Sequence, residues 1–310
     1  MGTLAIAPLG PEYTAYGVVI GLTAAIFGGL AAALVTRLPV LKSGPITATA
    51  VLWAAALAQV LSGARDPDGV ARAMALACLC GVMAGAMQVA MGLLRLGSAI
   101  KFVPYPVVAG FRNGIGLLML ISQVPVLIGT SHTLDAIPWS RIRDELRPVN
   151  VVVGIAVALV MWLLRYTRVR ILAPFLAIVA GTALYYLLNA LFSVQDTALA
   201  SRLPPYGEWL GHFVGAIASM DKIALVGDLA ALVPHAASIA IVASIFALLG
   251  AKVMDQATHS RHDGNRELIA QGAGNIGAGA FGGMPISGLP SQSLLAYHGG
   301  GGSRAASLIA

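Results

Sequence analysis

The stretch Ser43-Gly44-Pro45-Ile46-Thr47-Ala48-Thr49 is repeated in outline by Ser287-Gly288-Leu289-Pro290-Ser291-Gln292-Ser293. Both read S-G-x-x-[ST]-x-[ST], both follow a proline (Pro39 and Pro285), and both interrupt a hydrophobic segment. The two positions lie seven predicted membrane spans apart, so the equivalent segments run through the membrane in opposite directions. Such inverted repeats occur in many secondary transporters, where discontinuous helices bring their N-termini to a site at the bilayer midplane. The pair predicts an all-α polytopic membrane protein with two broken half-helices that meet at the midplane.

The composition supports a membrane protein and argues against an enzyme. Of the 310 residues, 58% are hydrophobic and only 10% are charged, whereas an ordinary soluble domain has about 25% charged residues. A spanning helix takes about 20 apolar residues, so the chain has room for about ten spans and for no sizeable catalytic domain. Cys78 and Cys80 lie in one apolar run with no third ligand nearby, which favours buried core residues over a metal site. We expect neither a metal nor a cofactor.

Apolar runs of spanning length occur at 14–35, 45–61, 72–94, 103–128, 149–164, 171–193, 230–252, 266–283 and from about 287. The two long connections, 129–148 and 194–229, contain enough charge and proline to lie in water or at the membrane interface. No linker separates a second domain. We therefore expect residues 1–310 to form a single transmembrane domain, with 194–229 as an extracytoplasmic connection.

The positive net charge of +6 is explained by orientation in the membrane. Short cytoplasmic loops are enriched in Lys and Arg. One set of alternate loops collects ten such residues against three acids (Asp255, Asp263 and Glu267), and we assign it to the cytoplasm: Arg37, Lys42, Arg95, Lys101, Arg165, Arg168, Arg170, Lys252, Arg261 and Arg266. The opposite set, which includes Arg72 and Asp228, has seven Lys and Arg residues against ten acids. No Lys/Arg-rich run forms a basic face, so a nucleic-acid partner is not expected.

A helix that begins inside the membrane suits an anion. Its first backbone N–H groups have no partner in the helix and carry the positive end of the helix dipole. An anion accepts hydrogen bonds from these groups and is attracted by the dipole. In the first stretch, Gly44 permits close backbone approach, Pro45 fits the first helical position, and Thr47 adds a hydroxyl.

The second stretch offers a comparable set of groups. Ser287 is a candidate helix cap, and Ser291 and Gln292 supply a hydroxyl and an amide. The alternative is that both stretches are simple kinks between two packed helices. Under the anion hypothesis, two facing half-helices bind the anion without a fixed cation.

Other motifs are interpreted as structural. The run Gly272–Gly277 matches G-x-G-x-x-G, but no strand precedes it and no acid follows about 20 residues later. Helix packing through Gly272, Gly279 and Gly283 is the better interpretation. His259 and His262 lie in a polar turn, where a solvated loop is favoured over a metal site.

Arg112 is a candidate functional residue, because its charge falls inside a predicted span. Arg112 either draws anions toward the site from the cytoplasm, or it snorkels to the interface or bonds a neighbouring carbonyl. No predicted span contains a carboxylate near its centre, although Asp255 lies at the inner end of 230–252. This favours an exchanger or an anion uniporter over a tightly coupled symporter.

Four segments resemble the SulP sulfate-permease family of anion transporters. They are LAIAPLGPEYTAYG (4–17), SGPITATAVL (43–52), KFVPYPVVAGFRNGIGLLMLISQVPVLIG (101–129) and RHDGNRELIAQGAGNIGAGAFGGMPISG (261–288). The resemblance implies two inverted seven-helix repeats, an elevator-like motion, a homodimer in the complete protein and a cytoplasmic STAS domain after the last helix. It also divides the chain into core elements 1–101 and 230–310 and gate elements 102–193.

Measured against that family pattern, the 7+7 fold is incomplete in this chain. We expect the start of the first helix, helices eleven to fourteen and the STAS domain to lie outside these residues. Without them one face of the core has no gate, so we expect these 310 residues alone not to transport.

The resemblance also places an anion site between the half-helices that start near Pro45 and Pro290. The residues implied nearest the substrate are Ile46, Thr47, Ser291 and Gln292, joined by Ile6 from the first helix and by Ser244 and Phe246 from 230–252. The family often has a basic residue in place of Gln292 and a carboxylate in place of Phe246. Pro290 also removes one N–H group from the second half-helix.

The expected function is secondary transport of a small anion of the sulfate, bicarbonate or dicarboxylate class by alternating access. Two alternatives stay open: a transporter of the same architecture for uncharged solutes such as nucleobases, and a non-transporting fragment. Acidic residues on the broken helices would favour nucleobases, and these segments contain none. We expect a multi-pass protein of the bacterial inner membrane whose partners are the lipid bilayer and a small anion.

Overall fold

A computed structural model describes residues 1–10, 13–36, 41–61, 67–98, 148–167, 172–192 and 204–298, with isolated helical positions between 106 and 128. The chain divides into two compact units. The first comprises Met1–Pro104 and Arg202–Ala310, and the second comprises Tyr105–Ser201. The predicted roles of core and gate for these parts of the chain stay predictions. Arg112 and most of the predicted span 103–128 lie outside the described residues.

The first unit contains both broken segments. Its elements are α1 (Gly2–Ala5), η1 (Ala7–Leu9), α2 (Thr14–Thr23), η3 (Ala24–Gly28), α3 (Gly29–Val35), β1 (Ser43–Pro45), α4 (Thr47–Val60), α5 (Pro67–Leu93), α10 (Tyr206–Ser219), α11 (Lys222–Thr258), α12 (Gly264–Ala280), β2 (Ile286–Gly288) and α13 (Pro290–His298). In this part of the chain, three helical stretches are long and apolar enough to cross a membrane: Thr14–Val35, Asp68–Leu93 and Ala224–Thr258.

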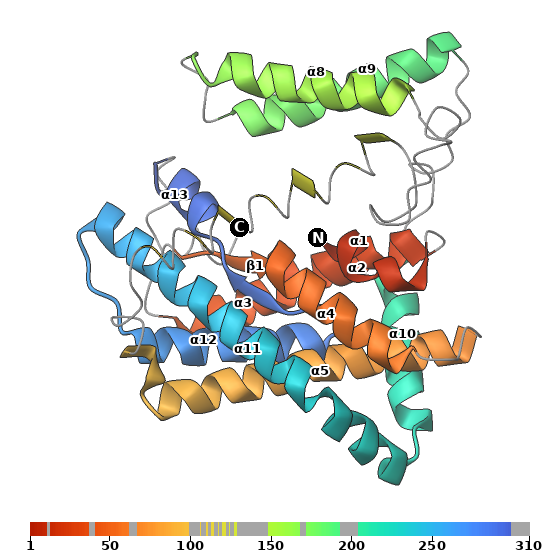
Figure 1. Ribbon diagram of the computed structural model, residues 1–310, viewed down its shortest axis with the longest axis vertical. Coiled ribbons are helices and arrows are strands. Elements are labelled where there is room, and N and C mark those ends of the chain that lie inside the picture. The colour runs from red at the N-terminus through yellow and green to blue at the C-terminus, as the bar shows by residue number, and fades with distance from the viewer. Residues whose placement is uncertain are drawn as a thin grey trace. The chain divides into compact units, whose positions relative to one another are not determined.

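Helix α12 lies along α5 (Figure 1), and glycines bring the two backbones together. A Cβ atom on Gly272 would stand 2.6 Å from the carbonyl oxygen of Gly85, and one on Gly279 would stand 2.6 Å from that of Cys78. Gly283 meets Ala24 of η3 in the same way, at 2.8 Å. Small residues permit such close packing of membrane helices. The packing interpretation of the glycine motif is therefore confirmed.

Strands β1 and β2 form an antiparallel pair that the sequence did not predict. The register places Ser43 opposite Gly288, Gly44 opposite Ser287 and Pro45 opposite Ile286. The ladder continues by one bond, because the Leu289 N–H donates to the Lys42 carbonyl at 2.8 Å. The two Ser-Gly motifs therefore pair with each other, the serine of one opposite the glycine of the other. Exchanging the two motifs gives the same pairing, because each serine lies opposite the glycine of the other motif. A pair related by two-fold symmetry requires this.

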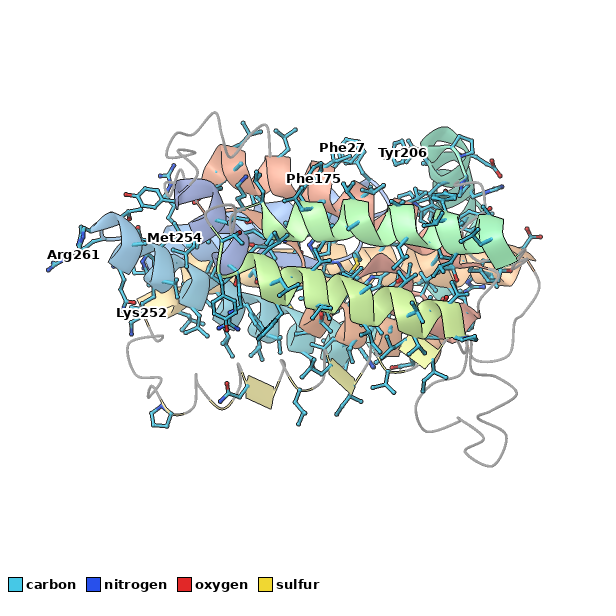
Figure 2. The ribbon with its side chains drawn as sticks, turned by 90° about the horizontal axis from the view of Figure 1, so that it is seen from above. Phe27, Phe175, Tyr206, Lys252, Met254 and Arg261 are labelled. Carbon is cyan, nitrogen blue, oxygen red and sulfur yellow. The ribbon has the colours of Figure 1, made fainter. Side chains whose placement is uncertain are left out.

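Helix α10 corrects the prediction that 194–229 is only a polar connection. Its aromatic residues anchor it: the Trp209 indole N–H donates to the Gly282 carbonyl at 3.1 Å, and the Tyr206 hydroxyl donates to the Phe281 carbonyl at 3.2 Å. Figure 2 shows Tyr206 beside Phe27, with ring centroids 5.8 Å apart. The segment folds because one face buries the aromatic surface of Trp209 and Phe213, while Glu208 and His212 lie on the exposed face.

Helix α11 is longer than the predicted span 230–252. It begins at Lys222 and ends at Thr258, and it continues through Pro234. Arg72 of α5 forms an ion pair with Asp228 at 2.7 Å near its start. The added turns contain charged residues. Hydropathy alone therefore does not predict them, because they extend beyond the apolar layer.

The second unit contains helices α8 (Pro148–Leu164) and α9 (Ala173–Phe192), which pack against each other. Gly181 of α9 makes room for Val157 of α8, whose methyl carbon lies 2.4 Å from a Cβ atom built on that glycine. Several large apolar side chains on the outer faces, including Trp162 and Phe175, are exposed. Exposed surfaces of this kind suit contact with lipid.

Candidate functional site

The first half-helix, α4, begins at Thr47 after an extended residue, Ile46. Within the described residues no side chain caps its N-terminus. The Thr47 hydroxyl donates to the sulfur of Met1 at 3.0 Å. The Thr49 hydroxyl lies 3.0 Å from the carbonyl oxygens of both Ile46 and Pro285. The first turn of α4 is therefore held to the residue that precedes β2, while its backbone donors stay without a side-chain cap.

Pro45 and Ser287 do not have the helix-terminal roles predicted for them. Pro45 lies in β1, two residues before α4, because the chain stays extended through Ile46. Ser287 lies in β2, and its hydroxyl donates to the Ala243 carbonyl of α11 at 2.7 Å. The Ser287 hydroxyl is therefore bonded to α11 and does not cap α13.

The second half-helix, α13, begins at Pro290. Ser293 secures this start, since its hydroxyl accepts the Lys42 N–H at 2.9 Å and donates to the Leu289 carbonyl at 2.7 Å. Ser291 and Gln292 occupy the first turn and are exposed. Each half-helix is thus tied through its first turn to the segment that precedes the other.

The remaining predicted site residues lie around this pair of half-helices. Ile6 is buried and packs against Gly17 of α2. Ser244 and Phe246 belong to the turns of α11 that β2 contacts, because a Cβ on Gly288 would lie 3.1 Å from the Cα of Ala247. Gly44 is similarly close to Leu289, whose Cδ1 lies 2.9 Å from a Cβ built on that glycine.

A buried carboxylate supports the start of β1, and sequence reasoning missed it. Glu267 was assigned to the cytoplasmic loops, but it is 3% exposed. Its two oxygens accept the Thr36 hydroxyl at 2.7 Å and the Gln271 amide at 2.8 Å, and the same amide donates to the Ser43 hydroxyl at 2.7 Å. The spacing of Glu267 and Gln271, four residues apart on one helix face, was the available signal.

A second buried polar chain joins α12, α5 and α11. The Ile286 N–H donates to Asn275 Oδ1 at 2.6 Å, Asn275 Nδ2 donates to Gln88 Oε1 at 2.5 Å, and Gln88 Nε2 donates to Ser244 Oγ at 3.2 Å. We call these groups the amide chain. Asn275 and Gln88 are completely buried. Because Asn275 is embedded in the glycine-rich run, sequence reasoning did not identify its role.

The turn between α11 and α12 corrects the interpretation of His262 as part of a solvated loop. Its ring pairs with Asp255, whose carboxylate also accepts the His262 N–H at 3.1 Å and the Ser260 hydroxyl at 3.1 Å. In contrast, Arg261 is exposed and projects from this end of the unit (Figure 2). Among the described residues no group of three or more His, Cys, Asp or Glu side chains could hold a metal ion.

Comparison with known proteins relates the chain to membrane transporters. Residues 5–310 match the sulfate permease family. The bicarbonate transporter BicA of Synechocystis sp. is 29% identical over 302 residues, which cover 94% of this chain and 48% of BicA. The putative sulfate transporter YvdB of Bacillus subtilis is 30% identical over 294 residues, which cover 90% of this chain and 48% of YvdB. The chain therefore spans about half the length of these curated relatives.

Solved structures agree with this relationship. The transmembrane domain of a cyanobacterial BicA matches with a TM-score of 0.75 and 26% identity, covering 99% of this chain and 78% of that one. SLC26A9 matches with a TM-score of 0.65 over 99% of this chain and 50% of that one, and at 16% identity it shows the fold alone. The predicted inverted-repeat transporter fold is confirmed. The chain belongs to the sulfate permease family.

Proposed function

We propose that the gene product that carries these residues transports a small anion of the sulfate, bicarbonate or dicarboxylate class by alternating access. The anion would be held between the N-termini of α4 and α13. The observation that supports this most strongly is the β1–β2 pair, which sets the two half-helices side by side at their N-terminal ends. Each end presents backbone N–H groups and the positive end of a helix dipole.

The side chains around these ends suit a small acceptor-only ligand. Ile46 and Thr47 lie at the start of α4, and Ser291 and Gln292 lie in the first turn of α13. Neither 43–60 nor 286–298 contains an acidic residue. A nucleobase carries N–H groups that need acceptors, so the absence of carboxylates from both segments favours an anion over a nucleobase. The relatives described as bicarbonate and sulfate transporters support the same class.

Isotope uptake into liposomes that contain the purified gene product tests this proposal. We expect saturable uptake of at least one labelled anion among bicarbonate, sulfate and succinate, with no uptake of uracil above that of empty liposomes. Uptake of uracil would show that the substrate is a nucleobase and not an anion. If no member of the panel enters above the empty-liposome level, the proposal is wrong and the non-transporting alternative is favoured.

The assembly proposed for the complete protein is a homodimer, as the family resemblance implies. Its test is the mass of the detergent-solubilised gene product, measured by light scattering with the detergent contribution subtracted. A mass of one copy at micromolar concentration would contradict the dimer.

A further inference from the structure

The amide chain has one possible direction of hydrogen-bond donation. It starts at the backbone N–H of Ile286, which can only donate. Asn275 must therefore turn its oxygen to this N–H, at 2.6 Å, and its Nδ2 to Gln88, at 2.5 Å. Gln88 must in turn present its oxygen to Asn275 and its Nε2 to Ser244. Reversing either amide would set a donor against a donor at a completely buried position.

This direction determines what the Ser244 hydroxyl can do. Since Ser244 Oγ accepts from Gln88, its own hydrogen is available to donate to another group. Ser244 lies next to Ala243, whose carbonyl accepts the Ser287 hydroxyl of β2, so this turn of α11 packs against the strand that leads into α13. A hydroxyl in a helix can donate to the carbonyl four residues earlier, but an anion at the half-helix ends is a stronger acceptor.

We propose that Gln88 and Asn275 are positioning residues that present the Ser244 hydroxyl as a donor to the transported anion. The inference rests on the proposed function and extends it with two residues on helices α5 and α12, neither of which supplies a half-helix. One backbone N–H of the segment that leads into α13 thus orients a side chain on α11. The same chain keeps β2 attached to α12 through Asn275.

The sharpest test reverses the direction of hydrogen-bond donation along the amide chain. In Asn275→Asp the carboxylate still accepts the Ile286 N–H but cannot donate to Gln88. The Gln88 amide then donates toward position 275 and turns its oxygen to Ser244, which consumes the hydroxyl hydrogen. We expect KM for the transported anion to rise about tenfold, the effect of losing one hydrogen bond to a charged group, while kcat changes less than KM.

A double-mutant cycle provides the second test. Gln88→Met removes the donor to Ser244, and Ser244→Ala removes the hydroxyl. We expect each change to raise KM about tenfold, and the double variant to resemble Ser244→Ala alone, because the two residues act through one hydrogen bond. Gln59→Met is the matched control, since its amide bonds the Ala231 carbonyl at 3.4 Å outside the amide chain. Its KM should match that of the unaltered protein.

The outcomes separate this inference from the proposed function. If the unaltered protein takes up no anion, both are wrong. If it takes up an anion but Asn275→Asp and Gln88→Met leave KM within twofold, the positioning role is wrong and the proposed function stands. Additive effects of Gln88→Met and Ser244→Ala on KM would also overturn it. Variants that fold poorly are identified by their yield in size-exclusion chromatography, and KM is independent of the amount of folded protein, so the conclusion rests on whichever variants fold.

Discussion

At the scale of single residues, Glu267 of α12 is an acid that the fold buries among hydrogen-bond donors. Its actual partners are Gln271, one turn later, and Thr36, 231 residues earlier. A carboxylate can be buried when hydrogen bonds replace its hydration. Those bonds depend on how distant segments meet, which a linear pattern does not contain.

Replacing Glu267 with Ala should destabilise the protein. The change removes from a buried site the carboxylate that accepts the Thr36 hydroxyl and one Gln271 N–H, at a cost of about 2–4 kcal/mol. We expect the unfolding temperature in detergent to fall by several degrees or more. Glu208→Ala is the matched control, because Glu208 is exposed on α10. Equal unfolding temperatures for the two variants would contradict the role assigned to Glu267.

Gln292 is the site residue at which the chain departs from the pattern that the family resemblance implies. It is exposed in the first turn of α13. On the proposed function, Gln292→Arg should lower KM for the transported anion about three- to tenfold at low salt, because a charge-assisted hydrogen bond replaces a neutral one. The gain should shrink as ionic strength rises.

Placing the same charge elsewhere isolates the effect of position. Gln59→Arg adds an arginine at an exposed position of α4 outside the first turn, and its KM should stay unchanged. If Gln292→Arg leaves KM unchanged as well, the start of α13 does not contact the anion.

At the scale of elements, the broken segments could be predicted and their pairing could not. The repeated Ser-Gly motif is local, so it marks where each hydrophobic segment is interrupted. The register of β1 and β2 depends on which backbone groups meet across the molecule. For the same reason Pro45 and Ser287 were assigned to helix ends, although both lie in strands.

Helix α10 was missed for another physical reason. Only Trp209 and Phe213 of this element are fully buried, and the surrounding residues include enough charge, glycine and proline to resemble a connection. A short amphipathic helix is stable mainly through its packing, and its partners, such as Gly282, lie far along the chain. The long apolar helices could be predicted from the sequence without knowledge of their packing partners.

The interface of α5 and α12 gives a prediction about helix packing. Gly272→Ala places a Cβ atom 2.6 Å from the Gly85 carbonyl oxygen, so the two backbones must separate. We expect a lower unfolding temperature in detergent and a lower yield of monodisperse protein, although alanine is the better helix former by about 1 kcal/mol.

The control for this packing prediction is Gly211→Ala on α10. A Cβ atom at Gly211 meets nothing within 4 Å in the structure. This variant should therefore match or exceed the stability of the unaltered protein. A Gly272→Ala protein as stable as Gly211→Ala would show that the close approach of α5 and α12 is not required.

At the scale of the whole molecule, the chain is a multi-pass integral membrane protein of a transporter family. The structure adds a consistency check on its orientation. Arg72 and Asp228, both assigned by sequence to the extracytoplasmic side, form an ion pair. Gly97 and Asn265, from two connections assigned to the cytoplasm, share a hydrogen bond at 2.9 Å.

Cysteine labelling tests the orientation directly. In right-side-out vesicles, a membrane-impermeant maleimide should label Ser219→Cys without treatment and Arg261→Cys only after permeabilisation, because both positions are exposed and lie in connections assigned to opposite sides. The native Cys78 and Cys80 are buried and should give little background. The opposite labelling pattern would invert the assigned topology.

The β1–β2 ladder has a consequence for how substrate preference can change. The frame that holds the two half-helix ends together consists of the main-chain bonds of β1 and β2, the bond from Leu289 to Lys42, and the hydroxyls of Thr49 and Ser293. None of these bonds uses the exposed side chains of Ser291 and Gln292. Evolution can therefore exchange residues such as Gln292 without dismantling the scaffold beneath them. A change in substrate preference can therefore alter exposed side chains of the first turns, while other atoms of the same short segments retain the architecture.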